Sequence, residues 1–268
     1  MKFISGEGFQ QMCDVYFGES DDFSYNPIIS EQTHKHKLLH TLTTQYNNPK
    51  LVFCYTHRLS EFVAKLPLFL NPFILVTHNS DYTIGENDIG FLENPMVLRW
   101  YSQNVNVIHH KLAWLPIGIA NQQWEHGNLR NWDNIHPRQN SEKTGIYFFF
   151  NIHTNALKRI ECKQILESKG LVFGDSLSHP DYLQRLASEM KYAICPEGNG
   201  VDSHRVWECF YTNTIPICIR SVHTELIAKR FPMILLDSWN DFDMSVLPNL
   251  TVSGNNDVNE FSFFQFEG

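Results

Sequence analysis

Short apolar runs, separated by polar or amphipathic stretches, recur along the chain from residue 51 onward. In the first half, four such runs have the length of buried strands: 51–56, 72–77, 105–110 and 113–120. Helices are predicted between them over 60–69 and 95–104. The first 50 residues are polar and irregular, and only 34–46 carries a helical signal. Strands that alternate with helices in this way predict parallel β-α-β units.

The second half repeats the alternation with greater regularity. Strand-length apolar runs lie at 145–152, 171–174, 191–196, 214–219 and 233–236. Helical signals, namely amphipathic periodicity or a favourable N-cap, predict helices over 156–169, 179–190, 203–212 and 221–231. Gly170 follows the first of these helices and is expected to end it, because glycine readily adopts the left-handed conformation of a helix C-terminus.

Residues 121–144 separate the two halves. They are rich in Asn, Gln, His and Trp and lack periodicity, which predicts a linker. We therefore expect an N-terminal domain over 1–120, a C-terminal domain over 145–245 and a tail over 246–268. The expected fold class is α/β, with two Rossmann-like domains facing each other across a cleft. Open α/β sheets bind ligands at the carboxyl ends of their strands, so a ligand is expected between the halves.

Composition narrows the function classes. The 268 residues carry a formal charge of −8, which disfavours a protein that mainly grips nucleic acid but leaves room for a small phosphate pocket. The six cysteines are widely spaced and mostly lie in apolar runs, which favours free thiols and a reducing compartment. The N-terminus lacks the apolar core of a secretory signal, and no apolar run is long enough to span a membrane. A cytoplasmic protein is expected.

The stretch 192–219 predicts a strand, a glycine-containing loop, a helix and a second strand. Gly198 and Gly200 allow the backbone to turn sharply after the first strand and to approach a ligand closely. Ser203 is a favourable helix N-cap, so the unpaired N–H groups of the helix start should face the same loop. Such a helix start is suited to an anion such as a diphosphate.

Two charged residues follow in the first turns of this helix. The helix dipole disfavours a cation at Arg205, which makes more sense if an anion lies nearby. Glu208 lies three residues later on the same helical face, where a carboxylate can accept hydrogen bonds from ribose hydroxyls. Two simpler alternatives stay open: Arg205 and Glu208 form an ordinary surface pair, or Arg205 pairs with Asp202.

The string CPEGNGVDSHRVWECFYTNTIPI, residues 195–217, resembles the signature of the exostosin-like family of glycosyltransferases. In that family a P-x-G loop, an S-x-R and a Glu three residues later precede a short helix and an I-P-V/I strand. Residues 232–243 and 151–159 are also similar to family segments, and the resemblance is faint over 1–120. It implies a GT-B fold, a UDP-sugar donor, inversion at the anomeric carbon and no bound metal.

Carried over residue by residue, the resemblance implies that Arg205 and Glu208 contact the diphosphate and the ribose. Asn155 and Arg159 become candidates on a facing loop and helix. The full expected donor site comprises Asn155, Arg159, Pro196, Glu197, Gly198, Asn199, Gly200, Asp202, Ser203, Arg205 and Glu208. The chain is shorter than the animal exostosins and shows no membrane anchor, so its acceptor and compartment need not match theirs. A compact soluble member, of a kind that a virus could use on its own glycoproteins, is expected.

An inverting transfer needs a base that takes the proton of the acceptor hydroxyl. The expected base follows the strand 72–77, where Asp81 is the first choice and His78 the second, with Glu86 and Asp88 after them. The alternative is that this segment is an ordinary turn, since Asn and Asp favour turns.

Three further expectations concern ligands. The absence of an evident basic residue for a sugar carboxylate favours a neutral hexose or xylose over glucuronic acid, and an oligosaccharide or glycoprotein is the expected acceptor. No histidine pair has the spacing of a metal site with a carboxylate third ligand, so no metal is expected. Two other functions stay open: a GDP-sugar-dependent, fucosyl-type transferase, and a non-catalytic nucleotide- or carbohydrate-binding module.

Overall fold

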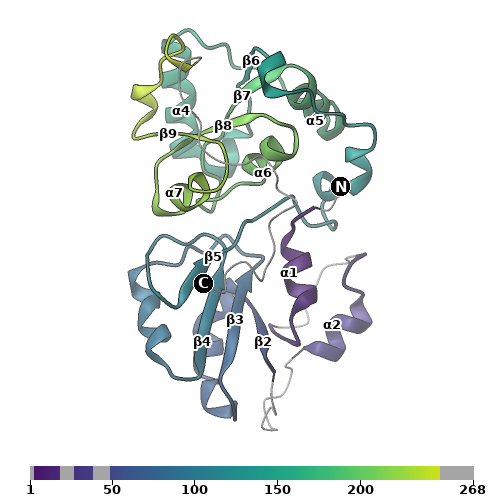
Figure 1. Ribbon diagram of the computed structural model, residues 1–268, viewed down its shortest axis with the longest axis vertical. Coiled ribbons are helices and arrows are strands. Elements are labelled where there is room, and N and C mark those ends of the chain that lie inside the picture. Colours follow the sequence, from purple (N-terminus) through teal and green to yellow (C-terminus); the bar gives the residue numbers. More distant parts are fainter. Residues whose placement is uncertain (1–2, 19–26, 39–48, 248–268) are drawn as a thin grey trace. The chain divides into compact units, whose positions relative to one another are not determined.

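The protein is described by a computed structural model over residues 3–18, 27–38 and 49–247. The described residues divide into two compact units, 3–128 and 129–247, and this division lies inside the segment 121–144 (Figure 1). Each unit contains one parallel sheet flanked by helices, an α/β architecture consistent with two Rossmann-like domains. Across the described ranges, no helix combines the length and the apolar character that crossing a membrane requires.

The N-terminal unit has a five-stranded parallel sheet whose strands follow one another in chain order. These strands are β1 (Val15–Phe17), β2 (Leu51–Tyr55), β3 (Phe73–His78), β4 (Val97–Ser102) and β5 (Leu112–Trp114). The helices are α1 (Gly6–Met12), α2 (Glu31–Lys37) and α3 (Leu59–Val63). Consecutive residues of β2, such as Val52, Phe53 and Cys54, are all buried, so both faces of the central sheet are covered, as parallel sheets require.

The C-terminal unit has a four-stranded parallel sheet, again in chain order. Its strands are β6 (Gly145–Tyr147), β7 (Met190–Ile194), β8 (Ile215–Ile219) and β9 (Ile234–Leu236). Its helices are α4 (Ala156–Ser168), α5 (His179–Ser188), α6 (His204–Tyr211) and α7 (Val222–Ala228).

Helices cover both faces of the C-terminal sheet. On one face, Ile194 and Ile217 belong to a core cluster with Cys162 of α4. Side chains alternate along a strand, so Cys195 points to the opposite face, where its Sγ lies 4.0 Å from that of Cys209 on α6. The carboxyl ends of the strands therefore lie between α4, on one face of the sheet, and α6, on the other.

The N-terminal unit corrects several of the expectations. The segment 95–104 was expected to be a helix but contains β4, which pairs with β3 and β5, so tertiary pairing overrides local signals. The expected strand 105–110 is irregular apart from one bridge at Val105. The expected strand 113–120 is shortened to β5, which ends at Trp114.

Within the described part of the first 50 residues, α1, β1 and α2 are regular elements that the polar composition did not predict in full. The expected helix 34–46 overlaps the end of α2, and its later residues fall outside the described ranges. The expected helix 60–69 is split into α3 and a 3₁₀ turn, Leu66–Leu68, where Pro67 has no N–H to continue an α-helix.

In the C-terminal unit the four expected helices are confirmed, with ends that differ by a few residues. Gly170 has a φ of 91°, and its N–H donates to Glu167 O at 3.0 Å, which confirms its place at the end of α4. The expected strand 145–152 is too long, because it pairs only as β6. The expected strand 171–174 is wrong, because this segment is not a strand. The carbonyls beyond β6 are instead used by side chains and loops, as described below.

Lys143 ties together three elements of the C-terminal unit. Only 2% of the residue is exposed, and its Nζ donates to Leu186 O, Thr212 O and Thr214 Oγ1, each at 2.9 Å. Burial lowers the pKa of Lys143 to about 8, so most of the ammonium stays protonated at neutral pH. One side chain thus satisfies acceptors at the end of α6, within α5 and before β8.

The variant Lys143→Met should lower the free energy of unfolding by about 3 kcal/mol, because buried carbonyls would lose their donor. Urea denaturation followed by tryptophan fluorescence measures this loss. The matched control is Lys229→Met, at an exposed lysine of the same unit, which should change stability by less than about 0.5 kcal/mol. Equal stability of the two variants would contradict the assignment.

Candidate functional site

The expected donor-site residues gather at the carboxyl edge of the C-terminal sheet. Asn155 and Arg159 lie at and near the start of α4, which follows β6. The loop 196–203 follows β7, and Arg205 and Glu208 lie on α6 immediately after that loop. The carboxyl ends of parallel strands meet at one edge, so segments far apart in sequence converge there.

The start of α4 holds the glycine loop in place. Asn155 Nδ2 donates to Gly198 O at 2.8 Å, and Arg159 Nε donates to Glu197 O at 2.9 Å. Lys158 also forms an ion pair with the Glu197 carboxylate. A Cβ at Gly198 would lie 3.6 Å from Arg159 Nη2, so the bare backbone there packs closely beside a guanidinium. The loop backbone is therefore positioned by α4 before any ligand binds.

The rest of the loop divides into buried and accessible positions. Pro196 and Gly200 are buried, whereas Asn199 is exposed. Ser203 occupies the N-cap position of α6, as expected, but its hydroxyl makes no capping hydrogen bond. Its own N–H donates to Asp202 Oδ1 at 2.9 Å. The first turn of α6 is thus not capped by this serine side chain.

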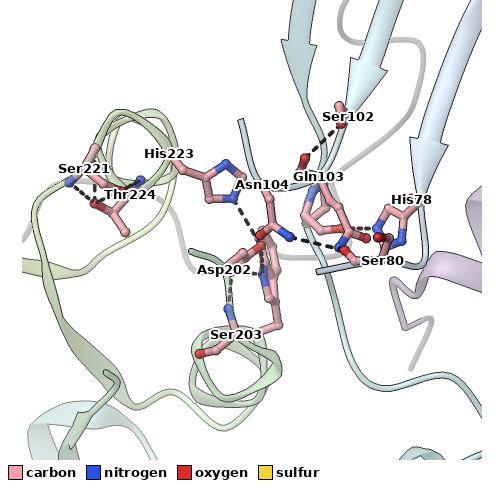
Figure 2. Close-up of polar contacts among 12 residues, drawn as sticks. His78, Ser80, Ser102, Gln103, Asn104, Asp202, Ser203, Ser221, His223 and Thr224 are labelled. Carbon is pink, nitrogen blue, oxygen red and sulfur yellow. Dashed lines mark hydrogen bonds and ion pairs between the residues drawn. The ribbon is translucent and has the colours of Figure 1, made fainter. Parts of the chain in front are cut away.

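Asp202 anchors the loop to the core. Its carboxylate accepts hydrogen bonds from Trp207 Nε1 at 3.1 and 3.0 Å, and Oδ2 lies 3.3 Å from Nε2 of His223 on α7 (Figure 2). It does not pair with Arg205, so that alternative is wrong. The buried tryptophan and histidine occupy the carboxylate, and its role is to fix the loop against α6 and α7.

Arg159 is a largely buried cation, with 9% of the residue exposed. Its Nη1 donates to Asn151 O at 2.6 Å, and its guanidinium lies 5.7 Å from the centre of the Phe150 ring. Burial, followed by the positive charge of Arg205, lowers the pKa of Arg159 to about 10. No carboxylate of the described chain forms an ion pair with it.

Arg205 lies in the first turn of α6. Its Nη1 donates to Phe149 O at 2.6 Å, and its guanidinium is 5.4 Å from the ring centres of both Tyr147 and Tyr182. Its Nε is buried and has no hydrogen-bond partner among the described residues. Burial opposes the charge of Arg205, yet its surroundings, chiefly Tyr182, keep its pKa above the ordinary value.

The two arginines together make this edge electropositive. Their hydrogen-bond acceptors, Phe149 O, Asn151 O and Glu197 O, are neutral carbonyls that orient the guanidiniums without cancelling their charge. The like charges oppose each other, since the positive charge of Arg205 adds to burial in lowering the pKa of Arg159. An anion placed between them would relieve this repulsion and gain charge-assisted hydrogen bonds. The arrangement is therefore suited to a phosphate-bearing ligand.

Glu208 is buried, with 5% of the residue exposed. Its Oε1 lies 2.9 Å from His179 Nε2, and its Oε2 accepts a hydrogen bond from the Tyr182 hydroxyl at 2.9 Å. Burial alone would raise the pKa of Glu208, but the hydrogen bond from His179 and nearby positive charges lower it. His179 Nδ1 lies 3.0 Å from Asn131 Nδ2, which leaves Nε2–H to donate to Glu208. Both carboxylate oxygens are thus engaged within the unit.

Sequence reasoning did not find His179 or Tyr182. They begin α5, three residues apart and hence on one helical face, which is the signal that could have indicated a shared partner. That partner lies 26 or more residues away along the chain, beyond the reach of local spacing.

The N-terminal unit contains the candidate bases. His78 lies at the end of β3 (Figure 2) and is buried. Its Nε2 lies 3.0 Å from Pro116 O, and its Nδ1 accepts from Asn79 N at 2.8 Å. These contacts make Nε2 the protonated nitrogen and leave neither nitrogen available as a base. Asp81 is exposed, three residues beyond the end of β3.

The other two acidic candidates differ from each other. Asp88 accepts hydrogen bonds from Gly85 N at 2.8 Å and from the Tyr82 hydroxyl at 3.2 Å, so it caps the 3₁₀ helix Glu86–Glu93. Glu86 is exposed at the start of that helix. Among the four candidates, His78 and Asp88 have structural roles, whereas Asp81 and Glu86 present accessible carboxylates.

A network of amides that sequence reasoning missed surrounds the end of β3. Asn79, with a φ of 58°, donates from Nδ2 to Gln10 Oε1 at 3.0 Å and accepts at Oδ1 from Asn121 Nδ2 at 3.0 Å. Its N–H also lies 3.0 Å from Gln103 Oε1. A side chain at Gly6 would overlap Asn79, so the start of α1 can pack against the end of β3 only because residue 6 is a glycine. The network fixes the turn that leads into Asp81.

Neither the comparison with protein-family models nor the comparison with curated proteins finds a match to this chain. Within 3–18, 27–38 and 49–247, no three His, Cys, Asp or Glu side chains are grouped as a metal ion would need. Because no match is found, the site is classified by its geometry alone. It is an electropositive, glycine-containing strand–loop–helix at the edge of a parallel sheet.

Replacement of Glu208 by Gln should change how stability depends on pH. Because the folded protein lowers the pKa of Glu208 below its ordinary 4.5, the carboxylate stabilises the fold above that value. This contribution is lost as the pH falls through the lowered pKa. The variant should be less stable at pH 7 and should lose less stability between about pH 5 and pH 3.

Urea denaturation across this pH range measures the effect. The control Glu189→Gln, at an exposed glutamate of the same unit, should keep the wild-type pH dependence. Wild-type acid sensitivity in Glu208→Gln would show that the ionised Glu208 does not stabilise the fold.

Proposed function

We propose that this protein is an inverting, UDP-sugar-dependent glycosyltransferase of the exostosin-like type, with a GT-B fold. It transfers a neutral hexose or xylose to a hydroxyl group of a glycan acceptor. The observation that carries the proposal is the pair of arginines Arg159, which is buried, and Arg205, which is partly buried, because no carboxylate of the described chain forms an ion pair with either. Their place beside a glycine loop at the edge of a parallel sheet is where such folds bind diphosphates.

In this proposal the C-terminal unit stabilises the leaving group. The acceptor oxygen attacks the anomeric carbon, the bond from that carbon to the diphosphate oxygen breaks, and the diphosphate leaves with the electron pair. Arg159, Arg205 and the N–H groups at the start of α6 oppose the negative charge that develops there. They are oriented before the reaction by neutral carbonyls, so little reorganisation is needed.

The proton of the acceptor hydroxyl goes to a base from the N-terminal unit, and Asp81 is the proposed residue. Its carboxylate is exposed and lies just beyond a parallel strand, on a turn that the Asn79 network holds. His78 is not proposed, because both of its ring nitrogens are occupied.

The variants Arg159→Ala and Arg205→Ala should each weaken UDP binding about 10- to 100-fold, the loss expected for one charge-assisted contact to phosphate. Isothermal titration calorimetry measures the affinity, and thermal unfolding verifies that each variant is folded. Arg220→Ala is the matched control, because Arg220 is exposed and pairs with Asp237 and Glu225. Unchanged UDP affinity in both site variants would place the pocket elsewhere.

The variant Asp81→Asn should abolish sugar transfer while UDP affinity stays within about twofold, because only the proton acceptor is removed. Glu86→Gln, at the other exposed candidate, is the control and should retain activity. Full transfer activity in Asp81→Asn would refute its role as the base.

A hydrolysis and transfer screen with a panel of UDP- and GDP-sugars tests the reaction itself. Turnover of a neutral UDP-sugar supports the proposal. Turnover of a GDP-sugar alone would identify a fucosyl-type enzyme, and binding without any turnover would identify a non-catalytic module.

A further inference from the structure

We propose that Glu208 is a positioning residue, which through Tyr182 holds Arg205 in the orientation that receives a diphosphate, and that it does not contact the ribose. This inference rests on the proposed function, because it concerns how the same site binds its ligand. The spacing of Arg205 and Glu208 alone suggests that Glu208 accepts hydrogen bonds from the ribose, and the inference replaces that role.

The first argument is the occupancy of the carboxylate. Each oxygen of Glu208 already has a donor at 2.9 Å, one from His179 and one from Tyr182. Each oxygen could accept a second hydrogen bond, but the side chain is only 6% exposed, so ribose hydroxyls have little surface through which to reach it. Uncovering this buried carboxylate would disturb its hydrogen bonds to His179 and Tyr182, which would cancel much of what ribose contacts gain.

The second argument is how loosely Arg205 is otherwise held. Its Nη1 donates to Phe149 O, and its buried Nε has no hydrogen-bond partner in the described chain. Further support comes from Tyr147 and Tyr182, whose ring centres are 5.0 Å apart and each 5.4 Å from the guanidinium. The orientation of the cation therefore depends on the orientation of these rings.

The third argument is that Glu208 fixes one of those rings without neutralising the cation. The Tyr182 hydroxyl donates to Glu208 Oε2, which fixes the hydroxyl end of the ring that lies beside Arg205. No ion pair forms between Glu208 and Arg205, so the guanidinium keeps its charge for a ligand. The chain of contacts runs from α5 through Glu208 and Tyr182 to the anion-binding edge.

Inorganic pyrophosphate separates the two roles, because it carries the diphosphate but no ribose. Its affinity and that of UDP are measured by calorimetry for the wild type, Tyr182→Phe and Glu208→Ala. If Glu208 acts through Tyr182, both ligands should lose affinity by the same factor, about fivefold, in each variant. Tyr192→Phe is the matched control, because it loses a buried hydroxyl contact, to Leu247 O, in the same unit without touching Arg205.

A double-mutant cycle excludes a merely structural effect. In an Arg205→Ala background, Tyr182→Phe should cause no further loss of pyrophosphate affinity, whereas general damage to the fold would still add its own loss. Weaker UDP binding with unchanged pyrophosphate binding in Glu208→Ala would assign Glu208 to the ribose and overturn the inference. Unchanged affinity for both ligands would overturn it as well. Failure of the wild-type protein to bind either ligand would refute the proposed function itself.

Discussion

The C-terminal unit depends on one constraint: two arginines at the edge of its sheet, Arg159 buried and Arg205 partly buried, need hydrogen-bond acceptors that leave their charge intact. The short strand β6 supplies them, because its pairing ends at Tyr147 and leaves the carbonyls of Phe149 and Asn151 available. Had the apolar run 145–152 paired along its whole length, these carbonyls would have been used by the sheet. The early end of one strand thus creates the electropositive edge.

Two helices, α4 and α6, hold the rest of the site at this edge of the sheet. The helix α4 carries Arg159 and Asn155 against the backbone of the glycine loop, and α6 carries Arg205 immediately after that loop. Asp202 contacts Trp207 and His223 and forms no ion pair with either arginine. Glu208 is likewise engaged by side chains of α5. Asp202 and Glu208, which are close to Arg205 in sequence, therefore stabilise the fold around the site. The guanidinium groups of Arg159 and Arg205 form no ion pair with them.

The N-terminal unit shows the same division between scaffold and accessible groups. At the end of β3, Asn79, Asn121 and the ring of His78 satisfy one another within a partly buried network. Only beyond that network does the chain present an exposed carboxylate, at Asp81. Buried polar side chains of this kind must be fully paired, which makes them rigid and unsuited to proton transfer.

The sequence by itself determined the α/β alternation, the four helices of the C-terminal unit, the helix end at Gly170 and the strand–loop–helix that carries Arg205, because each rests on local periodicity or on one residue's backbone preference. Only the tertiary structure decided that 95–104 is a strand, that β6 is short, and that Asp202 and Glu208 have partners other than Arg205. These outcomes depend on strand pairing and on side chains far along the chain, such as Tyr182 for Glu208. Spacing along a sequence contains no record of such contacts, since they form only when the layers pack.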